Sequence, residues 1–437
     1  MRSFLLRLLR LHDATPAERR AALWTAAFFF CVLCAYYLLR PLREEVGTTF
    51  GKANLLQLFT LTFVFITLLN PPYMLLANRL PPKRFIAGAL HAFAASFVLL
   101  GVLHAVAPTQ PQGVFAWDRL ECLLPAFFYS WVTAFSVCGV TLVWVHAVDW
   151  FTTQQGKRLF GLVSVGGTVG AIAASGIAWV SANLPLGVVV VAAAVVLELG
   201  ILAYRRSLAA CEQMVGGSPA PRVASGGAFA GLSLLVRSPY VAGIAGFVFL
   251  SAIMATAFYY TLNGLAETQI ESRDDRRAMF SMINLLQNAG ALAIQLWVTR
   301  TALLRLGVAV VLCIMPLISF FGLSLAALWP LIGAMAAFEV LRRTLQFAFD
   351  KPGREVLFTP LSLEAKYKSK AFIDTAVLRC GDLCGAVVND LLVKGQVAAG
   401  SVAAWSAPFV LAWAGLGYWL GRIGSRADRA SQRPSTS

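Results

Sequence analysis

The stretch YYLLRPLREEVG carries four charged residues within six positions, at the end of a long apolar run. On a helix, Tyr36, Arg40 and Arg43 share one face, because they stand at i, i+4 and i+7. An aromatic ring and two guanidinium groups on one face can bind an anion, since Arg pairs with phosphate or carboxylate through two parallel hydrogen bonds. Glu44 follows Arg40 by four positions and can pair with it while no anion is bound. The alternative is that both arginines only mark a helix end, where they reach water and lipid headgroups.

A second charged group lies in FEVLRRTLQFAFD, where Glu339 and Arg343 stand at i and i+4 and Arg342 lies on an adjacent stripe. The segment from Glu339 to Arg343 falls eleven to fifteen residues past Leu328, where an apolar stretch begins, and is therefore in the middle of a helix. This pattern fits two interpretations. The residues form a structural ion pair between helices, or they contact or gate a bound molecule.

The stretch KSKAFIDTAVLRCGDLCGAVVND holds a third group. Arg379 lies near its middle, Asp382 shares the face of Arg379, and Asp374 sits a turn or two below at an angle. In a separate apolar stretch, Asn284 and Asn288 are uncharged polar positions that can hydrogen-bond a ligand or cross-link helices. Arginines beside carboxylates can hold a multiply charged anion, and they can also couple its movement to protons or to an exchanged partner.

The elements that carry these residues are apolar. Of 437 residues, 58% are hydrophobic and 13% are charged, about half the charged share of a soluble domain. Stretches long enough to cross a hydrocarbon core of about 30 Å recur along the chain. We predict an all-α integral membrane protein with twelve transmembrane helices, at about 21–41, 55–76, 85–107, 120–147, 159–181, 184–203, 240–262, 279–299, 306–326, 328–349, 371–391 and 401–421. A charge inside such a helix costs about 2.5–3.5 kcal/mol, which makes the charged groups functional candidates.

The distribution of positive charge predicts the orientation in the membrane. With the N-terminus inside, 25 Lys and Arg fall on the cytoplasmic side and eight on the external side, which the positive-inside rule favours. Both termini are therefore expected in the cytoplasm, with the protein in a bacterial inner membrane. The net charge of +15 is then topogenic, and we expect no nucleic-acid partner. Residues 2–11 are expected to form an interfacial amphipathic helix, and Thr15 and Ser238 are predicted helix N-caps, each followed by Pro.

A polar segment rich in Gly, Ser, Pro and Ala divides the predicted helices into six and six. The expected organisation is an N-terminal bundle over 1–203, a central cytoplasmic loop over 204–238 and a C-terminal bundle with a basic tail over 239–437. The fifth helix of the first half carries GLVSVGGTVGAIAASG and the matching helix of the second carries RCGDLCGA. Such parallel repeats resemble the plan of the major facilitator superfamily, in which two six-helix bundles rock around a midplane site.

Several chemistries find little support in the sequence. The eight cysteines are scattered and give no disulfide framework. The four histidines are isolated, with no HExxH motif, no Ser-His-acid order and no clustered metal ligands. We therefore expect no metal, no cofactor, no catalytic residues and no enzyme activity. A membrane-embedded transferase that uses Asp149 and Asp350 is one alternative, and a non-transporting sensor or assembly protein is another; the sequence makes no prediction of oligomeric state.

Three motifs carry a more specific resemblance. The stretches YYLLRPLREEVG, GKRLFGLVSVGGTVGA and FAFDKPGREVLFTPLSLEAKYKSKAFIDTAVLRCGDLCGA resemble the ATP/ADP translocase (nucleotide transporter) family, twelve-helix carriers related to the major facilitator fold. In that family, basic residues of the first and eleventh helices hold phosphates. The resemblance therefore implicates Arg40 or Arg43, and Lys370 or Arg379. It also implicates intramembrane acids, for which Glu339 and Asp382 are the candidates. The chain departs from the family pattern by being shorter and by having Arg where Lys is expected in the first helix.

The sequence thus predicts a secondary transporter of an organic anion, working by alternating access on a nucleotide of the ATP/ADP exchange type or on a related phosphorylated compound. The alternative within transport is a proton-coupled carrier of another small organic solute. The expected substrate contacts are Tyr36, Arg40, Arg43, Asn284, Asn288, Lys370 and Arg379. The expected coupling or gating residues are Glu44, Glu339, Arg342, Arg343, Asp374 and Asp382.

Overall fold

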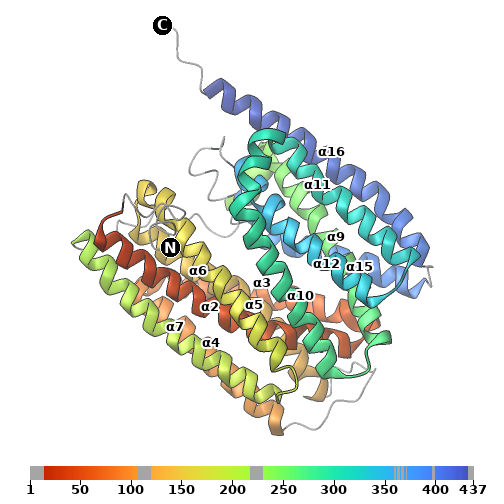
Figure 1. Cartoon of the computed structure of the whole chain (residues 1–437), viewed down its shortest axis with the longest axis horizontal. Helices are drawn as coiled ribbons and strands as arrows, with labels where there is room; N and C mark the ends of the chain where they lie inside the picture. The colour runs from red at the N-terminus through yellow and green to blue at the C-terminus, as the bar shows by residue number, and fades with distance from the viewer. Residues whose placement is uncertain are drawn as a thin grey trace. The chain divides into compact units, whose positions relative to one another are not determined.

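A computed structural model describes residues 14–106, 120–216, 230–358 and 399–431, and between these last two ranges residues 361, 365, 369, 370 and 372–395. All regular structure within the described residues is helical (Figure 1). The predicted amphipathic helix over 2–11 and residues 217–229 of the central loop lie outside the described residues.

The helices follow one another in the chain as α2 (Pro16–Phe50), η2 (Lys52–Asn54), α3 (Leu55–Arg79), α4 (Pro82–Val106), α5 (Leu120–Trp150), α6 (Thr153–Val180), α7 (Leu186–Val215), α8 (Ala230–Arg237), α9 (Pro239–Gln269), α10 (Arg273–Trp297), α11 (Thr299–Leu328), α12 (Ile332–Leu345), η3 (Gln346–Asp350), α13 (Lys351–Leu357), η4 (Ile373–Val377), α15 (Leu378–Lys394) and α16 (Ala399–Ser431). Of the short elements, η2 is a 3-10 helix, whereas η3 and η4 are π-helical.

Eight helices in the described part of the chain are long and apolar enough to cross a membrane: α2 to α7, α9 and α11. This agrees with the expectation of an all-helical integral membrane protein. The other four predicted spans fall on α10, α12 with η3, η4 with α15, and α16. The count of twelve spans stays a prediction.

Two helix starts are confirmed in atomic detail. At the start of α2, the Glu18 backbone N–H donates to Thr15 Oγ1 over 3.2 Å, while the Thr15 N–H donates to Glu18 Oε2 over 2.8 Å. This reciprocal capping box satisfies amide donors that the first helical turn leaves free. At the start of α9, Ser238 Oγ accepts from the Val241 N–H over 3.4 Å, and Pro239 occupies the first helical position.

The first long helix does not end where its charges begin. The sequence predicts a span that stops at residue 41, but α2 continues through Pro41 to Phe50. The chain leaves the helix at Gly51, whose φ of 79° lies in the left-handed region that favours glycine. The expectation that Arg40 and Arg43 mark a helix end is therefore wrong. Helical structure persists because the charged side chains of this segment find ionic partners, as described below.

The chain divides into two compact units. Unit 1 contains α2, the part of α3 from Val64 onward, α4 to α7, and α10 as far as Asn288. Unit 2 contains residues 51–63, α8, α9, the rest of α10 and the helices from α11 to α16. The bundle boundaries predicted from the sequence stay a prediction.

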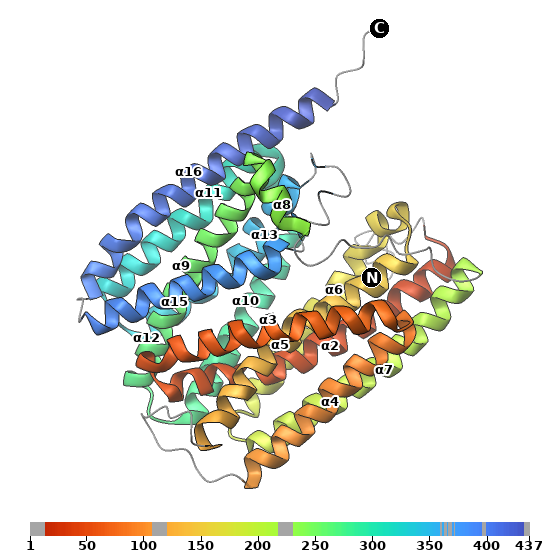
Figure 2. The same cartoon turned by 180° about the vertical axis from the view of Figure 1, so that it is seen from behind.

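Each unit pairs its helices in the same way. In unit 1, α2 packs on α6, and α4 packs on α7. In unit 2, α9 packs on α15, and α11 packs on α16. Figures 1 and 2 show α4 alongside α7, and α11 alongside α16, from both sides. Counted along the predicted spans, the first packs on the fifth and the third on the sixth in the first half. The corresponding spans of the second half pack in the same way, the seventh on the eleventh and the ninth on the twelfth. This recurrence is what parallel repeats produce.

Glycines permit the closest of these approaches. A Cβ atom at Gly166 or Gly170 of α6 would overlap backbone atoms of Ala26 or Phe30 in α2. Gly166 and Gly170 form a GxxxG motif within GLVSVGGTVGAIAASG, and this motif lies directly on the neighbouring backbone, as in close helix pairs of membrane proteins.

The equivalent pair in unit 2 uses the same spacing. A Cβ at Gly381 of α15 would stand 2.8 Å from the Phe249 carbonyl oxygen of α9, and one at Gly385 would stand 3.0 Å from Ile253 Cα. The glycines of RCGDLCGA thus have a packing role that matches that of the α6 motif.

Replacing Gly170 by Ala is expected to destabilise the protein by about 1–3 kcal/mol, because the added methyl group must displace the α2 backbone. Gly161→Ala on the same helix is the matched control, since its methyl group would meet no atom of the described residues within 4 Å. A helical Gly→Ala change otherwise stabilises by about 1 kcal/mol. Thermal unfolding of the two purified variants in detergent measures the difference, and a Gly170→Ala melting temperature at or above that of the wild type contradicts the close packing.

Candidate functional site

Arg40 lies among aromatic rings and a carboxylate on its own helix. Its guanidinium carbon is 5.9 Å from the centroid of the Tyr36 ring and 5.4 Å from that of Tyr37. Its Nη1 donates to Tyr37 Oη over 3.3 Å, and its Nε is 3.5 Å from Glu44 Oε1. The pairing of Glu44 with Arg40 expected from their spacing is therefore present.

Arg43 reaches a different helix of unit 1. Its guanidinium carbon lies 4.1 Å from the centroid of the Tyr129 ring of α5, within the range of a cation–π interaction. Its Nη1 also donates to Glu44 Oε1 over 3.1 Å. Arg40, Arg43 and Glu44, with their three tyrosines, form what we call the Arg40 cluster.

The Arg40 cluster is nearly dry. The side chains of Arg40, Arg43 and Glu44 are 13%, 15% and 3% exposed. One carboxylate thus contacts two guanidinium groups, and the three residues together carry a surplus of one positive charge. Interactions between charges are stronger in such surroundings than in water. An anion that displaces Glu44 would meet two planar guanidinium groups and the aromatic faces beside them.

Sequence reasoning missed Tyr37 and Tyr129 of the cluster, and it missed the two ionic contacts of the neighbouring Glu45. Tyr129 is distant in sequence, so no spacing could have linked it to Arg43. Glu45, whose side chain is 4% exposed, has Oε2 3.5 Å from Arg277 and Oε1 3.7 Å from Arg273, at the start of α10. The adjacent acids of REEVG therefore serve different cations: Glu44 pairs within α2, and Glu45 ties α2 to α10.

Of the two asparagines predicted on α10, Asn284 is the less satisfied. It is 1% exposed, and neither its Oδ1 nor its Nδ2 has a hydrogen-bond partner among the described residues. Asn288, by contrast, donates through Nδ2 to the Asn284 backbone carbonyl over 2.7 Å. A buried carboxamide without partners is costly, so Asn284 has both a donor and an acceptor available for a bound molecule.

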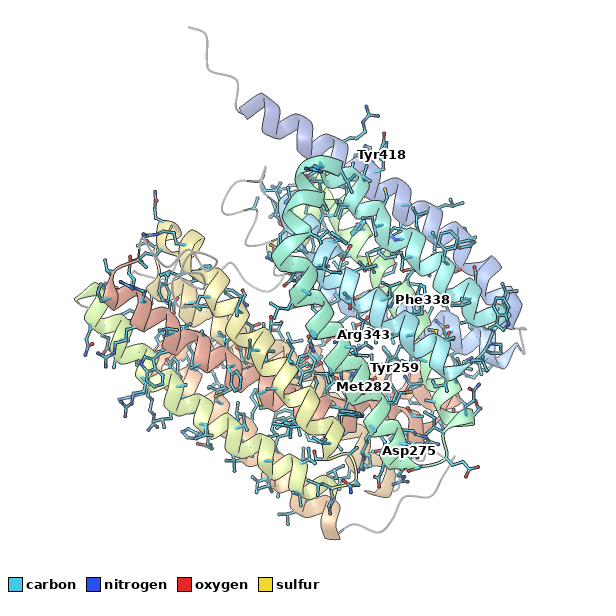
Figure 3. The ribbon with its side chains drawn as sticks, in the orientation of Figure 1. Tyr259, Asp275, Met282, Phe338, Arg343 and Tyr418 are labelled. Carbon is cyan, nitrogen blue, oxygen red and sulfur yellow. The ribbon has the colours of Figure 1, made fainter. Side chains whose placement is uncertain are left out.

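Unit 2 contains a second cationic group, the Glu339 cluster, built on α12. Glu339 is 1% exposed and accepts from Arg342 Nε over 2.7 Å and from Arg342 Nη2 over 2.9 Å, while Arg343 contacts the same carboxylate. The expected pair of Glu339 and Arg343 is present, and Arg342 joins it rather than pointing to a separate stripe. Figure 3 labels Arg343 together with Phe338, which lies on the same helix.

Aromatic rings flank this cluster too. The Arg342 guanidinium carbon is 4.9 Å from the centroid of the Phe258 ring of α9. Phe258 stacks on Phe338 at 5.9 Å with an interplanar angle of 7°. Each unit thus places two arginines around one buried glutamate beside an aromatic ring.

The remaining predicted residues form three separate ion pairs in unit 2. Arg379 Nη1 lies 2.9 Å from Asp382 Oδ2 on α15, and both side chains are 20% exposed. Asp374, in the π-helical η4, pairs instead with Arg354 of α13 at 3.5 Å. The third pair joins Lys370 Nζ to Glu355 Oε2 over 2.5 Å. Arg379 and Lys370 therefore belong to different pairs.

Within the part of the chain that the structure describes, no group of three or more His, Cys, Asp or Glu residues is arranged to hold a metal ion. The two acids of the transferase alternative, Asp149 and Asp350, belong to different units.

Solved structures identify the fold. The chain resembles the nucleoside transporter NupG with a TM-score of 0.59 and 14% identity, covering 93% of this chain and 99% of that one. It also resembles a POT family transporter with a TM-score of 0.57 and 11% identity, covering 95% and 97%. A bacterial homologue of the lysosomal transporter Spinster gives a TM-score of 0.53 at 13% identity, covering 97% and 100%. The chain is an integral membrane protein that shares its fold with these transporters.

Similarity to curated proteins is more specific than the similarity of fold. The chain is 24% identical to ADP,ATP carrier protein 1 of Chlamydia trachomatis over 85% of its own length and 82% of the relative's. The carrier of the same name in Chlamydia muridarum matches with the same identity and coverage. No protein-family model matches the chain. The resemblance based on the three motifs is thereby confirmed along most of the chain, and these relatives are carriers rather than enzymes.

Replacing Glu339 by Gln is expected to destabilise the protein by about 3–5 kcal/mol, because it removes the carboxylate that both buried arginines contact. Asp275→Asn, at an exposed position of α10, is the control for loss of an acid and should leave stability unchanged. Thermal unfolding in detergent compares the two variants. Equal melting temperatures would show that the Glu339 cluster contributes nothing to the fold.

Proposed function

We propose that this protein is a secondary transporter of an organic anion, most specifically a nucleotide exchanger of the ATP/ADP type, that works by alternating access. The similarity to ADP,ATP carriers along 85% of the chain carries the proposal. The related alternative is the proton-coupled movement of another small organic solute, and the experiment below separates the two.

The Arg40 cluster supports the phosphate end of such a substrate. Arg40 and Arg43 each present a planar fork that binds phosphate in bidentate fashion. In the proposed cycle, phosphate displaces Glu44 from the two forks, and Glu44 takes the arginines back when the substrate leaves. The rings of Tyr36, Tyr37 and Tyr129 offer flat faces for a base or sugar.

The charged residues of unit 2 suit coupling and gating. We assign Glu339 with Arg342 and Arg343, and Asp382 with Arg379, as pairs that exchange partners when an anion enters. Asp374 acts with them through its pairing to Arg354. Lys370 and Arg379 remain the two candidates in this region for a second phosphate contact, as the family resemblance implies.

The repeated helix pairings support an arrangement of twelve transmembrane helices in two six-helix bundles. The proposed topology places both termini in the cytoplasm, in agreement with the 25 to eight distribution of Lys and Arg. In this arrangement the glycines of α6 and α15 let each of these helices pack closely on a neighbouring helix of its own bundle.

Counterflow tests the function directly. Purified protein is placed in liposomes loaded with unlabelled ADP, and labelled ATP is supplied outside at neutral pH. Accumulation of label that requires internal nucleotide supports exchange. Absence of uptake under these conditions, together with proton-driven uptake of a different solute, would overturn nucleotide exchange in favour of the proton-coupled alternative.

Arg43→Gln is expected to raise the KM for ATP at least tenfold, because a charged hydrogen bond to phosphate contributes about 1.5–3 kcal/mol. Arg43→Lys, which keeps the charge but loses the fork, should fall between this variant and the wild type. Arg205→Gln, at an exposed position of α7, is the control for loss of a positive charge. Full transport with unchanged KM in Arg43→Gln would remove Arg43 from the substrate site.

Asn284→Leu is expected to reduce discrimination between ATP and GTP in competition assays. The free carboxamide can donate to and accept from one edge of adenine, as Asn does when it reads adenine in nucleic acids. Leu keeps a similar volume and removes both polar atoms, so the protein should still insert. If the ATP-to-GTP preference is unchanged in Asn284→Leu, Asn284 has no part in base recognition.

A further inference from the structure

An ionisable pair lies on the outer surface of unit 1, within two membrane-spanning helices. His91 Nδ1 of α4 is 2.9 Å from Glu198 Oε1 of α7. The two side chains are 46% and 47% exposed. Neither belongs to the Arg40 cluster.

The pair lies inside the membrane by helix geometry. α4 and α7 run antiparallel, since His91 contacts Glu198, whereas Gly101 lies beside Val190 and Gly187. His91 is nine residues, or about 14 Å, from the start of α4, and Glu198 is twelve residues, or about 18 Å, from the start of α7. Within the predicted spans, His91 lies about 9 Å from residue 85 and Glu198 about 8 Å from residue 203, so both lie within a hydrocarbon core of about 30 Å and nearer to one of its faces. Side chains as short as His and Glu do not reach either interface from there.

Around the pair, α4 exposes residues with small side chains and α7 exposes residues with larger apolar side chains. Gly88, Ala92 and Ala95 are exposed on α4 and fall on the same stripe as His91. A Cβ at Gly88 would meet no atom of the described residues within 4 Å. Val191, Val195 and Leu199 are exposed on α7 beside Glu198, and Figures 1 and 2 show α4 and α7 lying along one another.

We propose that the α4–α7 face is a docking surface for a second copy of this chain, joined by a two-fold axis along the membrane normal. Such an axis brings a face against itself and leaves every residue at its own depth. His91 and Glu198 lie at the same depth, and the imidazole can donate a hydrogen bond that the carboxylate accepts. Each His91 therefore meets the Glu198 of the other copy, and the four side chains form one polar network shielded from lipid.

A second copy suits this face better than lipid does. A lipid tail offers no hydrogen-bond partner to a carboxylate, and a charged or polar side chain in hydrocarbon is costly. Small residues let two helix backbones approach closely, while interhelical hydrogen bonds add to the stability of the contact. The α4 stripe supplies the first feature and the His91–Glu198 pair supplies the second.

Energy transfer between fluorophore-labelled copies of the full-length protein tests the proposal in phosphatidylethanolamine–phosphatidylglycerol vesicles over a range of protein-to-lipid ratios. The wild type should show saturable transfer that fits a dimer. Glu198→Leu should raise the dissociation constant of the dimer about tenfold. Gly88→Trp should abolish transfer by filling the surface where the helices meet.

Matched variants separate this interface from others. Gly161→Trp, at an open glycine of α6, should leave the dimer intact. His91→Glu should abolish dimers by placing four carboxylates together, and the exchange of both residues, His91→Glu with Glu198→His, should restore them. A wild type that stays monomeric at every ratio would overturn the proposal, as would a dimer that withstands both Gly88→Trp and Glu198→Leu, or one that Gly161→Trp disrupts equally.

Discussion

Burial of charge without water is the constraint on which this structure depends. In each unit, two arginines surround one glutamate whose side chain is at most 3% exposed. A lone cation in such surroundings would be very costly, so each guanidinium has a carboxylate, and those of Arg40, Arg43 and Arg342 also have an aromatic face. The pairing also explains why α2 stays helical through Arg40 and Arg43. Glu44 neutralises part of their charge within the helix, and the chain can therefore leave the helix later, at Gly51.

Close backbone packing is the second requirement. The glycines of α6 and α15 let each of these helices lie against α2 or α9 at distances that no side chain would allow. Because the contacts are set by backbone shape, they fix which helices can be neighbours in each unit. These contacts fix α2 against α6 and α9 against α15, and α2 carries Arg40 and Arg43 in unit 1, whereas α9 carries Phe258 in unit 2.

The sequence predicted what depends on local spacing and missed what depends on tertiary contact. Helix starts at Thr15 and Ser238, the pair of Glu44 with Arg40 and the pair of Glu339 with Arg343 all follow from distances of three or four residues. The sequence predicts the end of α2 too early, because a run of charges usually indicates an exit from the membrane. Tyr129 and Phe258 come from other helices, so their contacts with the arginines appear only once the chain has folded.

The π-helical η4 explains a further difference between spacing and structure. A π segment contains one residue more per turn than an α-helix would accommodate. Asp374 lies inside it and Arg379 after it, so the usual count of residues does not relate their directions. Each residue of an α-helix turns the chain by about 100°. A π turn completes about the same rotation with one extra residue, so removing one residue from η4 would give an ordinary helical turn and leave Arg379 and Asp382 facing the neighbours that they face now.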